Sequence, residues 1–595
     1  MNKIKKAISI FLALSLCLCL MAGCGDKAVT QTVYELPYYS GTNINEISGL
    51  SEYNENLWRR NTELLSGADP FILDNTAQDG YYYLYATNDA AYGFLGYRTT
   101  DFSTWECVGR VFTGKDGWSS YWAPEVVSED NGKGSLTYYL FFSAQPNELA
   151  ASGAFGKKMM FVATSSSPAG PFELLDFTDA ASCGEGNTHT NEGNYSYSDC
   201  ALFDYEALFE ALNEECGTDF SSSNLPSLID PSPFVDSNGD KYIYFSLEWP
   251  RLIIGMKMDN WYKIDYSTVT ILTRVGYYTL EDYEKEQAGE EVQKNKYELI
   301  GAKVNEGPSM IKHGGKYYLT FSINGYADAS YSVMQAVGDS PLGPFTKLGD
   351  DQNGLILSSD LRRNAMTSGT GHHSFFYVGD SLYICYHRHN VVGTIDAGRG
   401  ICVDEVRWVE TTGDNGETLD VLYVNGPTVT VQPRFDNDAE YTNIAGEGTV
   451  SLINGTLSEG SSVEYLNDGL LSYNVNVNQT FLDKYVGEAT TTTDATYEIT
   501  FNSTREICGF MVYGSKYQDR YFSSVYNIEL VAIENGQEKS YCIKELPTGE
   551  TCYGSGVYAE FASLNVKSIR FTVKLAEGNQ SVGISEIAVI GKRGE

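Results

Sequence analysis

Residues 230–246 read DPSPFVDSNGDKYIYFS, which is a short apolar stretch, a turn rich in Asp, Asn and Gly, and a second stretch built on tyrosine. Four other stretches have the same arrangement, and they are residues 69–87, 122–143, 306–322 and 371–387. Each of the five predicts a β-hairpin. Repetition of a hairpin along a chain is typical of a radial all-β array. We therefore expect an all-β fold whose main part is a five-bladed β-propeller.

Three of the five stretches carry a carboxylate at their start, namely Asp69, Asp230 and Glu306. The innermost strand of a propeller blade begins near the central axis, so polar residues that open these strands converge on one pocket. Pro70 and Pro231 follow the two aspartates, which predicts extended backbone at both. A single Asp-Pro pair is more often a turn residue, so the hypothesis of a site depends on the acids holding the same position in repeated blades.

The composition indicates a folded, strand-rich protein with more than one domain. The chain has 595 residues, of which 42% are apolar and 13% aromatic, with 44 tyrosines. A chain of this length exceeds one compact core. Its net charge of −37 disfavours nucleic acid and anionic membranes as partners. A neutral polymer is compatible with such a surface, and an acidity that serves only solubility is an equal alternative.

The first 24 residues have the pattern of an export segment. Basic residues precede an apolar run at 7–20, and Met21-Ala22-Gly23 stands before Cys24. Small residues before a cysteine resemble the bacterial lipobox, in which the thiol is lipidated. A transmembrane helix is the alternative, but an apolar run of about fourteen residues is short for one. We expect residues 1–24 to be a lipoprotein signal, residues 25–60 a tether, and Cys24 an anchor at the outer face of a bacterial membrane.

The remainder divides into two parts. The propeller is expected at residues 61–438, lengthened by polar insertions near 177–225 and 275–300, the first of which includes a short helical pattern. Residues 440–595 lack tryptophan and alternate apolar and polar residues, which predicts an antiparallel β-sandwich. Their pattern resembles the discoidin-like jelly roll, a galactose-binding-type module that binds sugars in some proteins and is structural in others.

Five short motifs follow one another in the order of a known enzyme family. They are Ala68-Asp69-Pro70, Trp122-Ala-Pro-Glu125, Ile229-Asp-Pro-Ser-Pro-Phe234, Glu306-Gly-Pro308 and Gly369-Thr-Gly-His372. On these motifs the chain resembles glycoside hydrolase family 43, whose members are five-bladed β-propellers that cleave arabinose- or xylose-containing glycans with inversion.

The resemblance implies a role for each acid. Asp69 would be the general base that holds the attacking water. Glu306 would be the general acid, which must be protonated near neutral pH and so needs a raised pKa. Asp230 would lie close to Glu306 and raise its pKa by repulsion between like charges. An inverting pair needs its two carboxyl groups roughly 6.5–9.5 Å apart, which leaves space for water.

Further residues have weaker assignments. His372 matches a family histidine often found beside a calcium ion with mostly water ligands; an axial histidine that only hydrogen-bonds the acids is the alternative. Arg399 matches an arginine that contacts the sugar. Trp122 and Trp249 are candidates for the sugar-binding wall, since aromatic rings suit the apolar faces of sugars. His387 and His389 share a strand face, but two ligands give little support for zinc.

Cysteines offer a separate prediction. The first insertion holds Cys183, Cys200 and Cys216, which outside the cell can form disulfides. Buried free thiols are the alternative for most of the cysteines. Beyond the export segment no two cysteines have the C-x-x-C spacing, so the sequence does not support a structural zinc site.

These features favour an exported, lipid-anchored glycosidase that acts on neutral plant-type glycans. An α-L-arabinofuranosidase or arabinanase is preferred, because the Ala-Glu-Gly-Gly run of many xylosidases is missing from residues 321–333. A β-xylosidase is the alternative within the family. A non-catalytic, surface glycan-binding lipoprotein is the alternative outside it. Fructan-cleaving propellers begin with a Trp-Met-Asn-Asp-Pro-Asn type motif, which residues 66–71 do not match.

Overall fold

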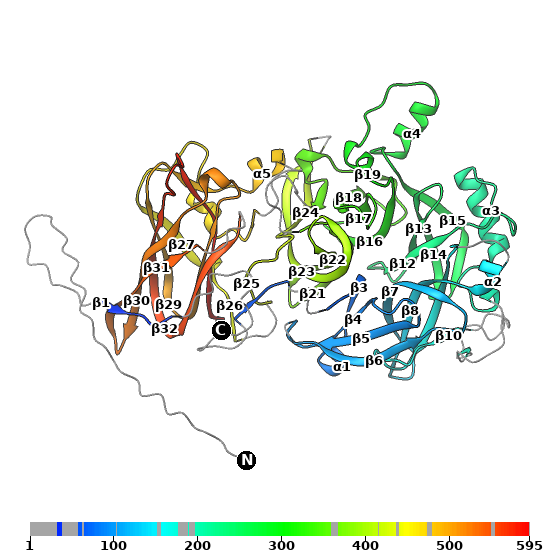
Figure 1. Cartoon of the computed structure of the whole chain (residues 1–595), viewed down its shortest axis with the longest axis horizontal. Coiled ribbons are helices and arrows are strands. Elements are labelled where there is room, and N and C mark those ends of the chain that lie inside the picture. Colours follow the sequence, from blue (N-terminus) through cyan, green and yellow to red (C-terminus); the bar gives the residue numbers. More distant parts are fainter. Residues whose placement is uncertain are drawn as a thin grey trace, which may run out of the picture.

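The computed structural model describes residues 33–38, 57–61, 65–102, 104–151, 156–175, 188–189, 197–358, 367–413, 416–435, 440–472, 479–548 and 554–593. The predicted signal at 1–24, with Cys24, lies outside this part of the chain. Within the described part, five sheets surround one axis, and a second β-domain lies beside the last of them (Figure 1). The prediction of an all-β fold with a five-bladed propeller is confirmed.

Each blade is an antiparallel sheet whose strands follow one another outward from the axis. Blade I contains β3 (Ala68–Asp74), β4 (Tyr82–Thr87), β5 (Gly93–Thr99) and β6 (Glu106–Thr113). Blade II contains β7 (Ser119–Asp130), β8 (Leu136–Gln145), β9 (Met159–Ser165), β10 (Glu173–Leu175) and β11 (Thr188–His189). Blade III contains β12 (Leu228–Val235), β13 (Lys241–Leu247), β14 (Leu252–Asn260) and β15 (Lys263–Arg274).

The last two blades follow the same plan. Blade IV contains β16 (Asn305–His313), β17 (Lys316–Ile323), β18 (Ser332–Gly338), β19 (Phe345–Lys347) and β20 (Leu355–Leu357). Blade V contains β21 (Gly371–Val378), β22 (Ser381–Val391), β23 (Thr394–Thr412) and β24 (Thr418–Val424). The ring closes where residues 65–67 pair with β23, through Ile401 N–H to the Leu65 carbonyl and Gly67 N–H to the Arg399 carbonyl.

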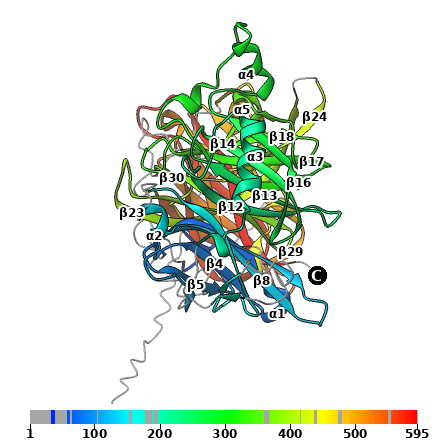
Figure 2. The same ribbon diagram turned by 90° about the vertical axis from the view of Figure 1, so that its right-hand side faces the viewer.

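Short helices lie outside the blades. They are α1 (Thr76–Asp79), α2 (Asn147–Ala151), α3 (Tyr205–Cys216), α4 (Leu280–Gln287) and α5 (Gln479–Tyr485), with 3-10 turns η1 (Tyr197–Asp199), η2 (Lys296–Leu299), η3 (Asp350–Gln352), η4 (Ala445–Glu447), η5 (Val463–Leu466) and η6 (Gln518–Arg520). Helices α3 and α4 belong to the two predicted insertions and lie at the periphery of the propeller (Figures 1 and 2). Asp204 caps α3, and Cys216 at its end is a free thiol whose pKa burial raises to about 12.

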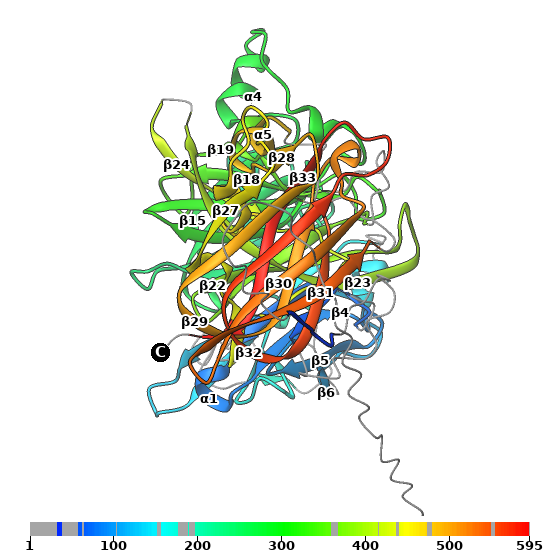
Figure 3. The same cartoon turned by 90° about the vertical axis from the view of Figure 1, so that its left-hand side faces the viewer.

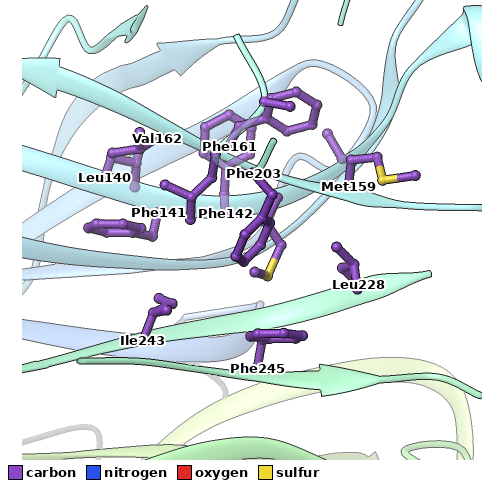
Figure 4. Close-up of a cluster of buried hydrophobic side chains, with 14 of the residues drawn as sticks. Leu140, Phe141, Phe142, Met159, Phe161, Val162, Phe203, Leu228, Ile243 and Phe245 are labelled. Atoms are coloured by element: carbon purple, nitrogen blue, oxygen red, sulfur yellow. The ribbon is translucent and has the colours of Figure 1, made fainter. Parts of the chain in front are cut away.

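Aromatic side chains fill the spaces between blades. The largest buried cluster joins blades I, II and III and also receives residues from the first insertion. Phe142 and Phe161 stack there with ring centroids 5.8 Å apart, and Phe203 from the insertion packs on Phe245 at 5.4 Å (Figure 4). The tyrosine-rich second strand of each hairpin, which made the repeat visible in the sequence, therefore supplies the packing between neighbouring sheets.

The start of every inner strand has the same irregular backbone. A register shift separates its first residue from the rest of the strand, and the residue at the shift has a positive φ. These residues are Asp69 (φ 51°), Ala123 (φ 49°), Asp230 (φ 59°), Gly307 (φ 56°) and His372 (φ 40°). The prediction of extended backbone at the two aspartates was wrong. The left-handed region costs an L-residue about 1–2 kcal/mol, and aspartate is one of the residues that enter it most readily.

The left-handed residue directs its N–H to the neighbouring blade instead of its own. The acceptor lies in the second strand of the preceding blade, opposite the start of that blade's inner strand. The bonds are Ala123 N–H to Thr87 Oγ1 (2.9 Å), Gly307 N–H to Ser246 Oγ (3.1 Å), His372 N–H to Ser322 Oγ (2.8 Å) and Asp69 N–H to His387 Nδ1 (3.2 Å). We call this set the inter-blade ring. The equivalent hydroxyl of blade II, Ser143 Oγ, is buried without a hydrogen-bond partner among the described residues.

The second domain is built on one extended sheet network with strand order β1-β31-β30-β32-β29-β33-β26, to which β27 and β28 also pair. Its strands are β26 (Tyr441–Asn443), β27 (Gly448–Asn454), β28 (Ala489–Thr491), β29 (Ala495–Gly514), β30 (Ser524–Glu534), β31 (Gln537–Pro547), β32 (Gly556–Lys574) and β33 (Val582–Lys592). Figure 3 views these long strands in front of the propeller. Bulges near the middle of β29 separate a half paired with β27 from a half paired with β33.

The segment predicted to be a tether contains two short strands, β1 and β2. Its residues Val33–Glu35 form β1, which pairs in parallel with β31, and Leu36 is buried in the core of the second domain. Further on, β2 (Trp58–Arg59) pairs with β25 (Gln432–Pro433), and Trp58 packs on Tyr558 with ring centroids 5.0 Å apart. Apolar residues and an available sheet edge therefore attach this segment to both domains. The resemblance of the second domain to a discoidin-like module stays a prediction.

The inter-blade ring predicts the outcome of two matched substitutions. Thr87→Val keeps the side-chain shape but removes the acceptor of the buried Ala123 N–H, so the free energy of unfolding should fall by about 1–3 kcal/mol. Ser143→Ala removes a hydroxyl that has no described partner at the equivalent position of blade II, so it should cost less than about 1 kcal/mol. Urea denaturation followed by tryptophan fluorescence measures both. Equal losses in the two variants would contradict a stabilising role of the ring.

Candidate active site

Asp69 lies in a cluster of polar groups at the start of β3. Its Oδ2 accepts a hydrogen bond from Thr87 Oγ1 at 2.7 Å. Its Oδ1 faces three nitrogen atoms, His372 Nδ1 at 3.3 Å, Arg399 Nη1 at 3.5 Å and His387 Nδ1 at 3.6 Å. The pKa of His387 is lowered well below its usual value by burial and by the Arg399 guanidinium, so this imidazole is neutral. Arg399 thus supplies the permanent positive charge beside Asp69.

Asp230 is held by the backbone next to Glu306. Its Oδ2 accepts hydrogen bonds from Gly307 N–H at 2.9 Å and from Ser246 Oγ at 3.2 Å. Gly307 directly follows Glu306, so Asp230 fixes the peptide that carries the second acid. Burial raises the pKa of Asp230, while the neighbouring His372 opposes that rise.

Glu306 has the electrostatic character of a proton donor. Burial and the nearby Asp230 raise its pKa to about 8, and Asp69 adds to the rise. A hydrogen bond with Tyr331 acts in the opposite direction without cancelling these effects. Glu306 is therefore mostly protonated at pH 7, which is the state that a general acid requires.

The three predicted acids therefore meet at one end of the propeller axis, as their positions at strand starts predicted. Asp69 and Asp230 both act on the ionisation of Glu306. Among the described residues no hydrogen bond joins Asp69 to Glu306. Asp69 contacts residues of blades I and V, whereas Glu306 forms a hydrogen bond with Tyr331 of blade IV. Asp69 nevertheless contributes, as a nearby like charge, to the raised pKa of Glu306.

One detail of the prediction was wrong. Asp69 and Asp230 occupy the left-handed position, but in blade IV that position belongs to Gly307, and Glu306 stands one residue earlier. Glu306 pairs with Ser322, just as Ala68 pairs with Thr87 in blade I. Glu306 therefore lies one residue before the strand position that the two aspartates occupy. A one-residue offset directs a side chain differently at a strand start, which suits two carboxyl groups with different tasks.

His372 and Arg399 both reach the site, as expected. His372 packs on Gly307, where an added Cβ would come within 3.1 Å of the imidazole ring. Arg399 lies over the ring of Tyr326 with its Cζ 4.8 Å from the centroid, which orients the guanidinium between that ring and Asp69. His389, in contrast, donates from Nε2 to the Tyr326 carbonyl at 2.8 Å and pairs through Nδ1 with Ser368 Oγ at 3.2 Å, so it does not join His387 in a metal site.

Trp122 has a neighbour that the sequence did not suggest. The ammonium of Lys158 lies 3.8 Å from the centroid of its ring, and Glu248 stands 4.0 Å from the same ammonium. Burial lowers the pKa of Lys158. One face of Trp122 is therefore occupied by a cation, so this ring offers less stacking surface than its position in the repeat indicated.

Trp249 and Tyr326 are open to solvent at the same end of the propeller. Trp249 follows the end of β13 and is 58% exposed, and Tyr326 in the loop after β17 is 47% exposed. Trp249 packs on Phe220 in a T-shaped arrangement with ring centroids 6.2 Å apart, and this contact supports the exposed ring. These two rings are the aromatic surfaces available to a large ligand that enters the site.

Several site residues escaped sequence reasoning, although a signal for them was present. Thr87, Ser246 and Ser322 are each the last residue of a repeated sequence stretch, and in blade V the same position is His387. A hydroxyl at the last position of hairpin after hairpin is visible in the repeat itself. Tyr331, which bonds Glu306 and stacks on His387 with centroids 5.5 Å apart, carries no such repeated signal.

Within the part of the chain that the structure describes, no three His, Cys, Asp or Glu side chains form a group that would hold a metal ion. The calcium ion beside His372 stays a prediction.

The comparisons with known proteins agree with this geometry. The family model described as glycosyl hydrolases family 43 matches residues 64–180 and 217–412, together more than half of the chain. A β-D-galactofuranosidase of Aspergillus niger is 38% identical over 117 residues, which are 20% of this chain and 31% of that protein. An extracellular exo-α-(1→5)-L-arabinofuranosidase of Streptomyces avermitilis is 33% identical over 98 residues, 16% of this chain and 20% of that protein.

Two solved structures are also similar to this chain. A thermostable family-43 glycoside hydrolase is 26% identical with a TM-score of 0.44 and covers 63% of this chain and 97% of its own. An endo-1,4-β-xylanase from Bacteroides thetaiotaomicron is 25% identical with a TM-score of 0.42 and covers 63% and 99%. The extent of the family match, over a propeller whose five motifs stand in the expected blades, shows that this chain belongs to glycosyl hydrolases family 43.

Proposed function

We propose that this protein is an inverting glycoside hydrolase that acts on arabinose- or xylose-containing glycans. Asp69 is the general base, Glu306 the general acid and Asp230 the residue that tunes and positions the acid. The observation that carries the proposal is the raised pKa of Glu306, about 8, beside Asp230 and across the site from Asp69. Two carboxyl groups whose environments separate their protonation states are what acid–base cleavage of a glycosidic bond requires.

The proposed reaction uses the contacts of each group. Asp69 holds a water molecule and accepts its proton while that water attacks the anomeric carbon. Glu306 donates its proton to the glycosidic oxygen as the bond to the leaving sugar breaks. Asp230 keeps its bond to Gly307 N–H throughout, so the peptide next to the acid stays in place. Thr87 and Arg399 orient the two oxygens of Asp69.

An α-L-arabinofuranoside is the substrate that we favour, and a β-xyloside is the alternative. The names of both curated relatives refer to furanosidases, which supports a furanose ring in the binding subsite. Trp249 and Tyr326 stand at the mouth of the site and are the proposed stacking surfaces for the rest of the glycan. Trp122 contributes a wall whose free face is limited by Lys158.

The decisive experiment is turnover of aryl glycosides. The full chain should hydrolyse 4-nitrophenyl α-L-arabinofuranoside faster than the β-D-xyloside, and proton NMR should show first a product of inverted anomeric configuration. Asp69→Asn and Glu306→Gln should each lower kcat by 10²–10⁴-fold, the usual effect of losing acid–base catalysis. Asp74→Asn, at the far end of the same strand, is the matched control and should leave kcat unchanged.

Two results would contradict this prediction. Glycan binding without turnover of any arabinoside or xyloside would favour the non-catalytic surface binder. Near-normal rates in Asp69→Asn or Glu306→Gln would remove that residue from its role. The thermal midpoint of Glu306→Gln should not fall, because the substitution removes a carboxyl group whose ionisation burial opposes.

The pH dependence tests the role of Asp230. Deprotonation of Glu306 stops the reaction, so kcat/KM should fall as pH rises through about 8. Asp230→Asn removes a negative charge that opposes this ionisation, so the pKa of Glu306 drops and the basic limb moves to lower pH. Glu248→Gln should move it less, because Glu248 is the weakest of the acidic neighbours. A basic limb that stays in place in Asp230→Asn would contradict the tuning role.

A calcium ion beside His372 is a further proposal. His372 would be the protein ligand, with water in the other positions, and the bound charge would favour the ionised forms of Asp69 and Asp230. After treatment with EDTA, CaCl2 should raise the thermal midpoint of the full chain and leave that of His372→Gln unchanged. His313→Gln, at the far end of β16, is the control and should respond like the parent. A midpoint that ignores CaCl2 in the parent would contradict calcium binding.

Lipid anchoring through Cys24 at the outer face of a bacterial membrane also stays a proposal. It rests on the lipobox-like sequence at residues 21–24. Among the described residues, no helix has the length and apolar character needed to cross a bilayer. The same proposal places the substrate outside the cell, where polymeric plant glycans are met.

A further inference from the structure

A second hollow lies far from the acids, at the junction of blade V with the second domain. Its volume is ≈ 310 Å³, at the lower end of the range for small-molecule sites. Blade V contributes β22 and β23 to its wall, and the second domain contributes β26, β29 and β33. The ribbon of β2 and β25 lies between the two domains in Figure 1 and forms a third wall.

The hollow is rich in hydrogen-bond donors. Three guanidinium groups line it, from Arg59, Arg407 and Arg434. Arg59 stands directly opposite Gln432 across the ribbon of β2 and β25. Gln432 is 4% exposed, and its Oε1 accepts a bond from Tyr513 OH at 3.2 Å. Its Nε2 is buried and finds no acceptor among the described residues, and neither does Nε of Arg59.

Few acceptors offset these donors. Glu405 is already occupied, with Oε1 on Arg407 Nη2 at 2.7 Å and Oε2 accepting from Asn425 Nδ2 at 3.0 Å. Glu586 faces the hollow and already accepts a hydrogen bond from Gly469 N–H at 3.3 Å, and burial and the adjacent Asp468 raise its pKa well above the usual value. Burial raises the pKa of Asp468 to about 6, and this group bonds Glu586 and not an arginine.

Among the described residues, the guanidinium of Arg434 has no hydrogen bond or ion pair, in contrast to those of Arg59 and Arg407. The backbone N–H of Arg434 bonds the Leu57 carbonyl, and Asp101 is the acid that favours its charge from a distance. Arg59 donates Nη1 to the Val403 carbonyl at 2.8 Å and lies 4.2 Å from the ring centroid of Phe435. A buried amide donor and a half-buried guanidinium therefore line the same hollow, and the amide Nε2 has no acceptor there among the described residues.

We propose that this junction hollow is a binding site for an oxyanion, either inorganic phosphate or sulfate or the carboxylate of a single acidic sugar. An anion with several oxygens supplies the acceptors that Gln432 Nε2 and Arg434 lack, and planar guanidinium groups match carboxylate and phosphate geometry. The site is distinct from the acids at the axis and does not depend on the proposed hydrolase activity.

Isothermal titration calorimetry on the full chain tests the proposal. The probes are sodium phosphate, sodium sulfate and sodium D-galacturonate, with D-galactose as the neutral counterpart of the sugar acid and sodium chloride at equal ionic strength. Saturable binding is expected for at least one of the three oxyanions and for neither control. Phosphate or sulfate alone would identify an inorganic anion site, and galacturonate alone would identify a site for acidic sugars.

Three variants assign the binding to the hollow. Arg434→Gln and Gln432→Leu should each weaken affinity about tenfold or more, the usual effect of losing a hydrogen bond to a charged group. Arg505→Gln removes an arginine that pairs with Glu447 elsewhere in the second domain and should bind like the parent. If Gln432→Leu does not fold, the affinity of Arg434→Gln and the comparison of D-galacturonate with D-galactose test the proposal in its place.

Three outcomes would overturn the proposal. They are absence of saturable binding for all three oxyanions, galactose binding as tightly as galacturonate, and unchanged affinity in Arg434→Gln. The first would mean that the hollow holds only water. The readout is binding and not turnover, so failure here and failure of the hydrolase proposal are distinguishable.

Discussion

The hydrogen bond between the start of one blade and the second strand of the blade before it is the interaction on which the site depends. In each case described, a left-handed residue turns its N–H away from its own sheet, and a hydroxyl or an imidazole of the neighbour accepts it. One of these left-handed residues is Asp69, and another is Gly307, which directly follows Glu306, so the bonds that join the blades also place two of the acids. Closure of the propeller and assembly of the site are one event, since Asp69 N–H to His387 joins the first blade to the last.

This arrangement has a cost in stability. Four non-glycine residues at the starts of the inner strands lie in the left-handed region, and each disfavours the fold by about 1–2 kcal/mol. Glu306 adds a pH-dependent cost, because its pKa is about 8 in the folded chain and 4.5 in the reference state. The folded protein thus binds the proton more tightly than the unfolded chain, and the free energy of unfolding contributed by this group falls as pH rises from about 4.5 to about 8. A carboxyl group that keeps its proton at neutral pH is useful to a reaction and unfavourable to the fold.

Much of this could be predicted from sequence, and the reasons for the remainder are physical. The hairpin repeat identified the blades because turn residues and tyrosine-rich strands are local signals. It also brought Asp69, Asp230 and Glu306 together, since strand starts share one end of the axis. The repeat could not show that Glu306 lies one residue before the left-handed position that the two aspartates occupy, because a bulge changes register without changing residue type. Extended backbone was expected before proline, but the bulge overrode that local preference at Asp69. The cation over Trp122 comes from residue 158, which no local pattern connects to the site.

The two ends of blade V explain why the junction with the second domain bears on the site. Strand β22 carries Tyr383 at the junction hollow and His387 beside Asp69, and β23 carries Arg407 at the hollow and Arg399 beside Asp69. Paired strands of a packed sheet move as a unit, so a displacement of one end of blade V also displaces the other end. A ligand in the hollow influences the acids only if it favours a different position of this blade. Arg399 Nη1 and Asp69 Oδ1 are 3.5 Å apart, and this contact joins blade V to blade I through a long and flexible side chain. We expect a shift of blade V to change this distance first.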